Sequence, residues 1–167
     1  MGQNVKVAVI GGGASGVFAA ICAAESSPQA QVDIFEKSQS PLAKVRISGG
    51  GRCNVTHACF DPRELVEHYP RGGQELLGPF HKFCTGDTMA WFEDRGVSLT
   101  IEADNRVFPL SNSSETIVDC LLDFAQRAGV TLSTKSGLKA LVSAPGGGFS
   151  LTLESDEVVH YDNVLMA

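Results

Sequence analysis

The stretch VAVIGGGASG, from Val7 to Gly16, carries the strongest structural signal in this sequence. It contains most of a short apolar run, Val5–Ile10, of the kind typical of a strand buried on both faces. Glycines follow this run at once, and the segment after them, Ala14–Ser26, is rich in small helix-forming residues. We therefore predict a strand, a tight glycine turn and a helix, in that order.

A second apolar run, from Gln31 to Glu36, completes the pattern. Pro28 disfavours a helical conformation in the residue before it, so the helix should end between Ser26 and Pro28. Strand, helix and strand then form a βαβ unit with parallel strands. This unit predicts an α/β fold of the Rossmann type.

The glycine turn matches the G-x-G-x-x-G pattern of dinucleotide-binding sites through Gly11, Gly13 and Gly16. The first glycine makes the tight turn, the second lets a pyrophosphate approach the backbone, and the third lets the helix pack closely on the strand. Glu36 ends the second strand, where a carboxylate accepts hydrogen bonds from ribose hydroxyls and repels a 2′-phosphate. The neighbouring Lys37 weakens the argument against NADP. The alternative is a close-packed turn beside a solvated carboxylate, and the pattern does not distinguish FAD from NAD.

The middle of the chain predicts a loop and then several short elements. The loop covers residues 38–56 and is broken by Pro41. After it we predict a short helix over 62–69, a helix from Thr85 or Asp87 to Gly96, and strands over 97–102 and 106–110.

The clearest helix covers residues 113–128, with Asn112 and Glu115 as an N-terminal capping pair and Gly129 beyond its end. We predict a β-meander after it, from VTLST, LKALVS and FSLTLE with a tight PGGG hairpin, and then a last strand that begins at Asn163. Because a domain rarely ends within a buried strand, we expect a fragment of a longer protein.

The net charge of −6 and the pI near 5.1 argue against a nucleic-acid or anionic-membrane partner. The five cysteines are odd in number and include no C-x-x-C pair, and the N-terminus lacks the pattern of a signal peptide. We therefore expect a reduced, cytoplasmic protein. The cysteines and histidines do not have the paired spacing of zinc ligands, so we expect no metal site.

A second glycine cluster, ISGGGRCN from Ile47 to Asn54, follows a proline-containing loop and precedes β-type residues. It therefore does not have the context of a second phosphate-binding turn. A glycine triplet with a polar tail suits a backbone that lies flat against a ring system, where side chains would clash.

Four segments, GGGASG, Glu36-Lys37, SGGGRCNVT and NRVFPLS, occur in an order that resembles the BaiN-like family of NAD(P)/FAD-dependent oxidoreductases. This family is also described as aminoacetone-oxidase-type flavoproteins. The resemblance implies that residues 1–167 form one FAD-binding domain, of the two-dinucleotide-binding type with an inserted β-meander. The chain would be the N-terminal part of a longer flavoenzyme that transfers hydride between FAD and a small organic substrate. NAD(P)H is a candidate second redox partner, and the alternative is a non-catalytic dinucleotide-binding module or an inactive fragment.

The resemblance also implies the residues of the FAD site. Those around the pyrophosphate and the adenosine are Gly11, Gly13, Ala14, Ser15, Gly16, Glu36 and Lys37. Those on the flavin side are Lys44, Ser48, Gly49, Gly50, Gly51, Arg52, Cys53 and Asn54. The family usually has Gly-Arg-Lys just before the second cluster, whereas this chain has Leu42-Ala43-Lys44, so Lys44 alone matches.

The polar residues of the second cluster have alternative roles. Arg52 would pair with the pyrophosphate or with a surface carboxylate, and we favour the cofactor. Asn54 would donate to a flavin carbonyl or cap a turn. Cys53 would be a redox thiol or a small packing residue, and we favour packing because no second cysteine is adjacent. We expect Trp91, Phe92 and Phe108 in the core, and we assign no catalytic acid or base.

Overall fold

The structure is a computed structural model that describes residues 4–167. The chain divides into two compact units: unit 1 contains the residues up to Val45 and from Leu121 onward, and unit 2 is Arg46–Cys120. The chain enters unit 2 within helix α2 (Ala43–Ile47) and leaves it within helix α6 (Ser114–Arg127). Among residues 4–167, no helix combines the length and the apolar character needed to cross a bilayer.

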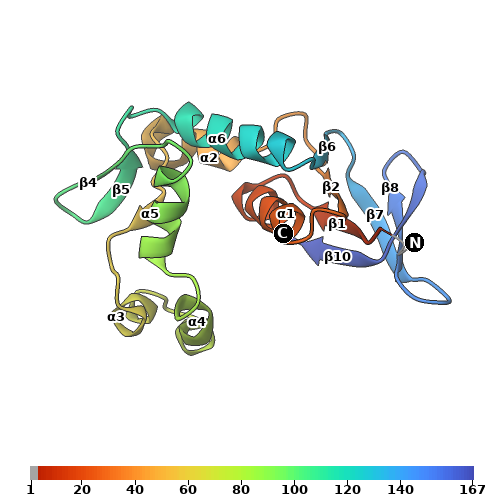
Figure 1. The fold of residues 1–167 in the computed structure, drawn as a ribbon, viewed down its shortest axis with the longest axis horizontal. Coiled ribbons are helices and arrows are strands. Elements are labelled where there is room, and N and C mark those ends of the chain that lie inside the picture. The colour runs from red at the N-terminus through yellow and green to blue at the C-terminus, as the bar shows by residue number, and fades with distance from the viewer. Residues whose placement is uncertain (1–3) are drawn as a thin grey trace. The chain divides into compact units, whose positions relative to one another are not determined.

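Unit 1 is built on a parallel sheet with the strand order β10-β1-β2-β6. Figure 1 shows β10, β1 and β2 side by side, and the register places Val9 opposite both Ile34 and Leu165. The bounds are β1 (Lys6–Ile10), β2 (Gln31–Phe35), β6 (Thr131–Ser133) and β10 (Asn163–Met166). The predicted strand, turn, helix and parallel strand are confirmed, and so is the α/β class.

Helix α1 (Ala14–Ser26) packs on this sheet because its apolar residues recur on one face. Val17, Ala20 and Ile21 have no exposed surface, and Val9 and Ile34 of the strands are equally buried. The helix ends where the amide of Ser27 donates to the carbonyl of Ala23 (3.1 Å), within the predicted interval. This packing fixes the turn between β1 and α1.

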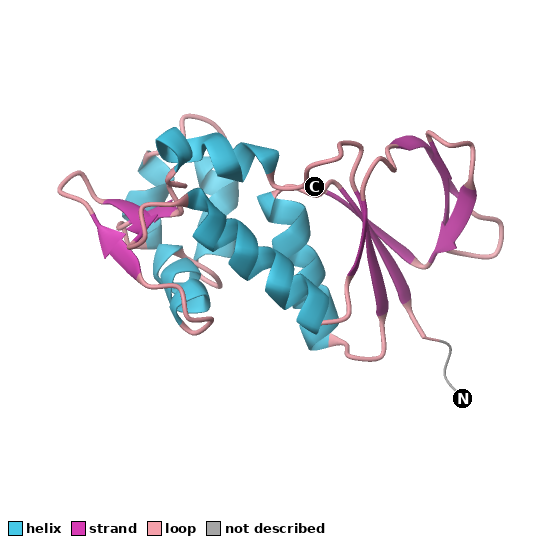
Figure 2. Cartoon of the chain, turned by 90° about the horizontal axis from the view of Figure 1, so that it is seen from above, coloured by secondary structure: helices cyan, strands magenta, loops and turns pink. Residues whose placement is uncertain are grey.

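A second, antiparallel sheet in unit 1 forms the predicted meander. Its strands are among the magenta arrows on the right of Figure 2. Its strands are β7 (Leu138–Ser143), β8 (Phe149–Leu153) and β9 (Val158–Tyr161), in that order. One assignment from the sequence was wrong: VTLST contributes β6, which pairs in parallel with β2 and lies outside the meander. The third meander strand, β9, was not predicted because its apolar run is short and follows charged residues.

A buried polar pair joins the two sheets of unit 1. Asp33 in β2 is 5% exposed. Its carboxylate accepts hydrogen bonds from the Tyr161 hydroxyl and from the side-chain amide of Gln31, each at 2.7 Å. Burial, together with this bond to a carboxylate, raises the pKa of Tyr161, so the phenol stays protonated. The Tyr161 ring also meets Phe35 edge to face, with ring centroids 5.7 Å apart.

Unit 2 contains an antiparallel sheet with the order β3-β5-β4 and several short helices. The strands are β3 (Thr56–His57), β4 (Leu99–Ile101) and β5 (Arg106–Pro109), and the helices include α3 (Pro62–Glu67), α4 (Gly73–Phe80) and α5 (Thr85–Glu93). Helix α5 starts as predicted at Thr85, because the Asp87 carboxylate accepts from the amide of Cys84 (2.7 Å). Phe92 and Phe108 are buried, which confirms their assignment to the core, whereas Trp91 is half-buried.

Three details of unit 2 differ from the sequence analysis. Helix α2 and the 3-10 helix η1 (Ser48–Gly51) lie within the segment predicted as loop, and α4 was not predicted. Helices this short show no clear apolar periodicity in the sequence. The cap of α6 is Ser113, whose hydroxyl accepts from the amide of Glu115 (3.4 Å), whereas Asn112 lies at φ 54° before the helix.

Candidate functional site

The first glycine turn is shaped by close contacts between backbone segments of unit 1. Gly11 has φ +114°, and a Cβ atom there would lie 2.6 Å from the carbonyl oxygen of Ala167. A Cβ atom on Gly16 would lie 1.9 Å from the carbonyl oxygen of Gly11. Glycine is therefore required at both positions, for the turn and for the close approach of helix α1.

The N-terminus of α1 is open beside this turn. Gly13 caps the helix with extended backbone and no side-chain hydrogen bond, and the first helical turn holds no acidic residue. A Cβ atom on Gly13 would meet nothing within 4 Å, and Gly13, Ala14 and Ser15 are exposed. The first amides of the helix therefore face a free space with a partial positive charge, which is suited to a pyrophosphate.

Glu36 lies next to the same turn and is held in an ionised state. Its carboxylate accepts from the amide of Gly12 (2.6 Å) and from the amide of Ser38 (2.7 Å). Desolvation opposes ionisation, but the hydrogen bonds from Ser38 and Gly12 outweigh it and lower the pKa of Glu36 below its usual value. Each carboxylate oxygen keeps a lone pair for a further donor, such as a ribose hydroxyl.

The structure thus brings Gly11, Gly13, Gly16 and Glu36 together within unit 1. It adds two residues that the sequence analysis did not assign to the site, Gly12 and Ser38, whose amides orient the carboxylate. Lys37 and Lys44 are exposed, Lys44 in the first turn of α2. An uncapped helix, an open glycine and an ionised carboxylate fit the adenosine and pyrophosphate of a dinucleotide.

The second glycine loop, Ser48–Asn54, lies in unit 2 and has a different construction. Gly49, Gly50 and Gly51 have φ values of 56°, 69° and 86°, and Cys53 is also at positive φ. A Cβ atom on Gly49 would lie 2.8 Å from the Phe108 ring and 2.8 Å from the amide nitrogen of Asn54. A Cβ atom on Gly50 would meet nothing within 4 Å, so this glycine leaves its backbone accessible.

Arg52 joins this loop to the β4–β5 hairpin of the same unit. Its guanidinium donates to the carboxylate of Glu102 (2.5 Å) and lies 3.9 Å above the centre of the Phe108 ring. The amide of Val55 donates to the carbonyl of Val107 (2.8 Å), so the two segments are also paired through their backbones. The segments SGGGRCNVT and NRVFPLS therefore form one structural element. Sequence analysis did not identify Glu102 as part of it.

Cys53 and Asn54 differ in their exposure. Cys53 is buried, and its amide donates to the carbonyl of Ser48 (3.0 Å). Burial raises the pKa of the Cys53 thiol, although a hydrogen bond with the Ser48 side chain acts in the opposite direction. A neutral buried thiol supports a packing role. The side chain of Asn54 is exposed.

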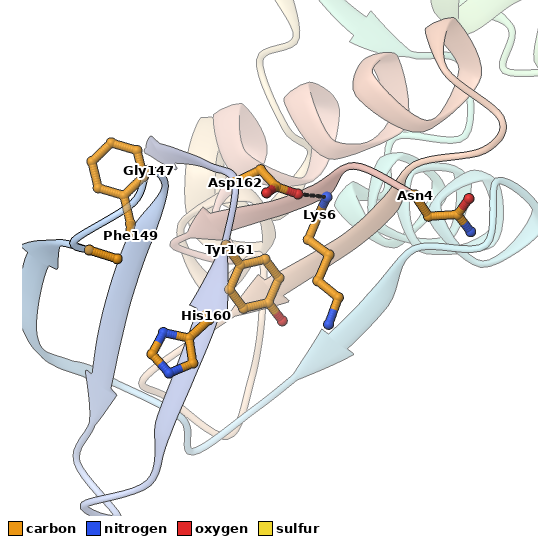
Figure 3. Close-up of a pocket in the computed structure, with 8 residues that line it drawn as sticks. Asn4, Lys6, Gly147, Phe149, His160, Tyr161 and Asp162 are labelled. Atoms are coloured by element: carbon orange, nitrogen blue, oxygen red, sulfur yellow. Dashed lines mark hydrogen bonds between the residues drawn. The ribbon is translucent and has the colours of Figure 1, made fainter. Parts of the chain in front are cut away.

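A groove of about 510 Å³ lies elsewhere in unit 1, at the start of β1 and the turn between β7 and β8. Figure 3 shows the hydrogen bond that the backbone amide of Lys6 donates to the Asp162 carboxylate, with 2.7 Å between nitrogen and oxygen. Because the glycine turn follows the other end of β1, this groove does not belong to the dinucleotide site. Within the described part of the chain, no three His, Cys, Asp or Glu residues are grouped to hold a metal ion.

Comparison with known proteins gives the family. A sequence model of the HI0933-like protein Rossmann domain matches residues 5–167. This chain belongs to the HI0933-like family. The resemblance predicted from the sequence motifs is therefore confirmed, and it covers nearly the whole chain.

Two curated relatives of this HI0933-like chain are enzymes by name. It is 32% identical to a 3-dehydro-bile acid delta(4,6)-reductase of Clostridium scindens, over 84% of this chain and 34% of the relative. It is 27% identical to a ribosomal RNA dihydrouridine synthase of Escherichia coli, over 90% of this chain and 36% of the relative. The chain thus spans about a third of the length of these relatives.

Solved structures support the fold assignment. A 3-ketosteroid-delta4-(5alpha)-dehydrogenase of Rhodococcus jostii is similar to 99% of this chain, with a TM-score of 0.67 and 16% sequence identity. The matched part is 46% of that enzyme. The HI0933-like chain therefore shares its α/β fold with part of that dehydrogenase.

Proposed function

We propose that this HI0933-like chain is the FAD-binding part of a flavoenzyme. The observation that carries this proposal is the ionised Glu36 beside the open Gly13 and the uncapped N-terminus of α1. Glu36 would accept from the adenosine ribose, and the first amides of α1 would hold the pyrophosphate. The second glycine loop, with Ser48–Asn54, would face the flavin end.

The residues of the chain bind and orient, and the cofactor supplies the redox chemistry. Bound FAD would supply hydride transfer and electron storage. Gly11 and Gly16 would keep the turn narrow, and Gly12 and Ser38 would keep the Glu36 carboxylate oriented toward the ribose. Cys53, buried and neutral, would pack beneath the loop without exchanging protons.

We propose a carbon–carbon double bond conjugated to a carbonyl as the group that is reduced. The names of both curated relatives describe saturation of such a bond, one in a 3-oxo bile acid and one in the uracil ring. A small enone is the first candidate, because that relative has the higher identity and because a net charge of −6 opposes binding to RNA. A uridine in RNA is the second candidate.

A reductase also needs a source of electrons, and we propose NAD(P)H. We further propose a reducing, cytoplasmic location, which the odd number of cysteines and the lack of a C-x-x-C pair in the sequence support.

Cofactor release tests the first part of this proposal. The chain and the full-length product of its gene are purified and denatured, and the released small molecule is identified by chromatography and absorbance. We expect FAD, or strong quenching of flavin fluorescence when FAD is added to the purified protein. Release of NAD, or no binding of added FAD by either protein, would contradict the proposal.

Turnover of the full-length product tests the substrate. With NADH or NADPH as the reductant, we expect loss of the ultraviolet absorbance of a 3-oxo-Δ4 steroid. An RNA oligonucleotide with unpaired uridines serves as the competing substrate. Reduction of the RNA alone would transfer the assignment to the second candidate.

A further inference from the structure

The charge of Arg52 is already matched by groups of unit 2. Glu102 lies 2.5 Å from its guanidinium, and the side chains of the two residues are 32% and 33% exposed. The face of the guanidinium is covered by Phe108, which has no exposed surface. A guanidinium held by a carboxylate and a ring has both its charge and its orientation fixed.

The surroundings of Arg52 are electrically balanced as well. Arg106 pairs with Glu102 (3.6 Å) and with Asp104 (2.7 Å), so two guanidinium groups face two carboxylates. Arg52 carries the one formal charge in the segment Ser48–Asn54. The second glycine loop therefore presents no unbalanced positive charge to an anionic ligand.

Phe108 connects this ion pair to the shape of the loop. Gly49 packs so closely on the Phe108 ring that a Cβ atom would lie 2.8 Å from it, and Arg52 lies over the face of the same ring. The pairing of β3 with β5 anchors the segments on both sides. Glu102, Arg52 and Phe108 thus hold one end of a loop in which the exposed Gly50 offers its backbone, as do the other exposed residues Gly49 and Asn54.

We propose that Arg52 is a positioning residue that shapes the second glycine loop, rather than a phosphate ligand. Glu102 and Phe108 hold Arg52 in that role. The inference rests on the proposed function, in which this loop faces the flavin. It assigns the phosphates of FAD to the first glycine turn alone.

A double-mutant cycle tests the inference in the full-length product, with FAD affinity measured by fluorescence quenching. Glu102→Gln and Arg52→Gln should each weaken FAD binding about fivefold, because each breaks the contact that holds the loop. The double variant should bind as weakly as either single variant, because the loss of one partner already releases the loop. Asp104→Asn, a neighbouring carboxylate that pairs with Arg106, is the matched control and should bind like the wild type.

An Arg52 that binds phosphate predicts a different result for Glu102→Gln. Glu102→Gln would then free the guanidinium and keep or increase the affinity for FAD, and the double variant would bind as weakly as Arg52→Gln. That result would overturn the inference. The flavin absorption spectrum is recorded for each variant, because a general loss of stability would not shift it. We expect the same shift in both single variants and in the double variant.

Hydrogen exchange without FAD separates this inference from the proposed function. In Glu102→Gln the amide hydrogens of residues 49–54 should exchange faster than in the wild type, whereas those of α1 should exchange at the wild-type rate. In Asp104→Asn both segments should exchange at the wild-type rate. Unchanged exchange at 49–54 would overturn the positioning role. If the wild type does not bind FAD, the proposed function fails, and the exchange result still decides whether Glu102 and Arg52 hold the loop.

Discussion

The first glycine turn and the second glycine loop have similar composition but are shaped by different contacts. In the first turn, Cβ atoms on Gly11 and Gly16 would collide with backbone carbonyls of unit 1. In the second loop, Gly50 and Gly51 have space for a Cβ atom, and their positive φ angles are what favour glycine. Glycine thus serves close packing at Gly11 and Gly16 and backbone conformation at Gly50 and Gly51, whereas Gly49, at positive φ and close to Phe108, is required for both reasons.

The two regions also differ in what holds them. The first turn is fixed by a parallel sheet, a helix and backbone hydrogen bonds, such as that from the amide of Gly11 to the carbonyl of Phe35 (2.9 Å). The second loop depends on side chains, Arg52 and Phe108 above all. Substitutions of Gly11 and Gly16 should therefore act mainly on folding, whereas substitutions in the second loop should act more locally.

The largest effect is expected for Gly16→Ala. Because its Cβ atom would lie 1.9 Å from the carbonyl oxygen of Gly11, helix and turn must separate. We expect a loss of about 3 kcal/mol or more in the free energy of unfolding, measured by urea denaturation. Gly13→Ala is the control: it should keep full stability and yet weaken FAD binding. Equal stability of the two variants would contradict the close-packing interpretation.

A smaller effect is expected for Glu36→Gln, and in binding rather than folding. A neutral amide is a weaker acceptor for ribose hydroxyls, so FAD affinity should fall by about 2 kcal/mol, measured by titration calorimetry. Glu93→Gln, which changes an exposed carboxyl in unit 2, should bind FAD like the wild type. Wild-type affinity in Glu36→Gln would exclude Glu36 as the ribose ligand.

Gly50→Ala should lower the free energy of unfolding, measured by urea denaturation, by about 1–2 kcal/mol, because alanine is strained at φ 69°. Asparagine, which tolerates this conformation better, should cost less. Gly78→Ala in α4, where φ is ordinary and space is free, should leave stability unchanged or increase it. If alanine at 50 and alanine at 78 behave alike, conformation is not what requires glycine in the second loop.

The smallest effect is the pH dependence due to Glu36. Its pKa in the folded protein lies below the ordinary value of 4.5, so its contribution to stability is complete above that pH. The contribution is lost as the pH falls through the lowered pKa. Urea denaturation between about pH 6 and pH 3 should show a shallower decline for Glu36→Gln than for the wild type. Parallel declines would show that Glu36 is not stabilised in its ionised form.

The sequence predicted the regions where local pattern and tertiary contacts agree. Strand β1, helix α1 and strand β2 follow apolar runs bounded by glycine and proline, and their predicted limits agree closely with those observed. Strand β6 was assigned to the wrong sheet. Its partner β2 lies about a hundred residues earlier in the sequence, and the three residues of β6 do not indicate which strand they pair with.

The site divides in the same way. Gly11, Gly13, Gly16 and Glu36 were identified because a motif specifies their spacing. The interaction of Arg52 with Glu102 spans fifty positions of sequence, and nothing in the local pattern selects that carboxylate over its neighbours. Phe108 was expected in the core, but its contact with Gly49 follows only from the pairing of β3 with β5.

The pairing of β1 with β10 has a consequence for the order of folding. Residues 7–10 lie beside residues 163–166, and Gly11 and Gly16 pack against Ala167. During synthesis, β1, α1 and β2 leave the ribosome long before β10 is made, so one edge of β1 stays without its strand partner until then. Contacts so distant along the chain slow folding. Competence to hold a nucleotide should therefore appear late, in one step, when β10 docks.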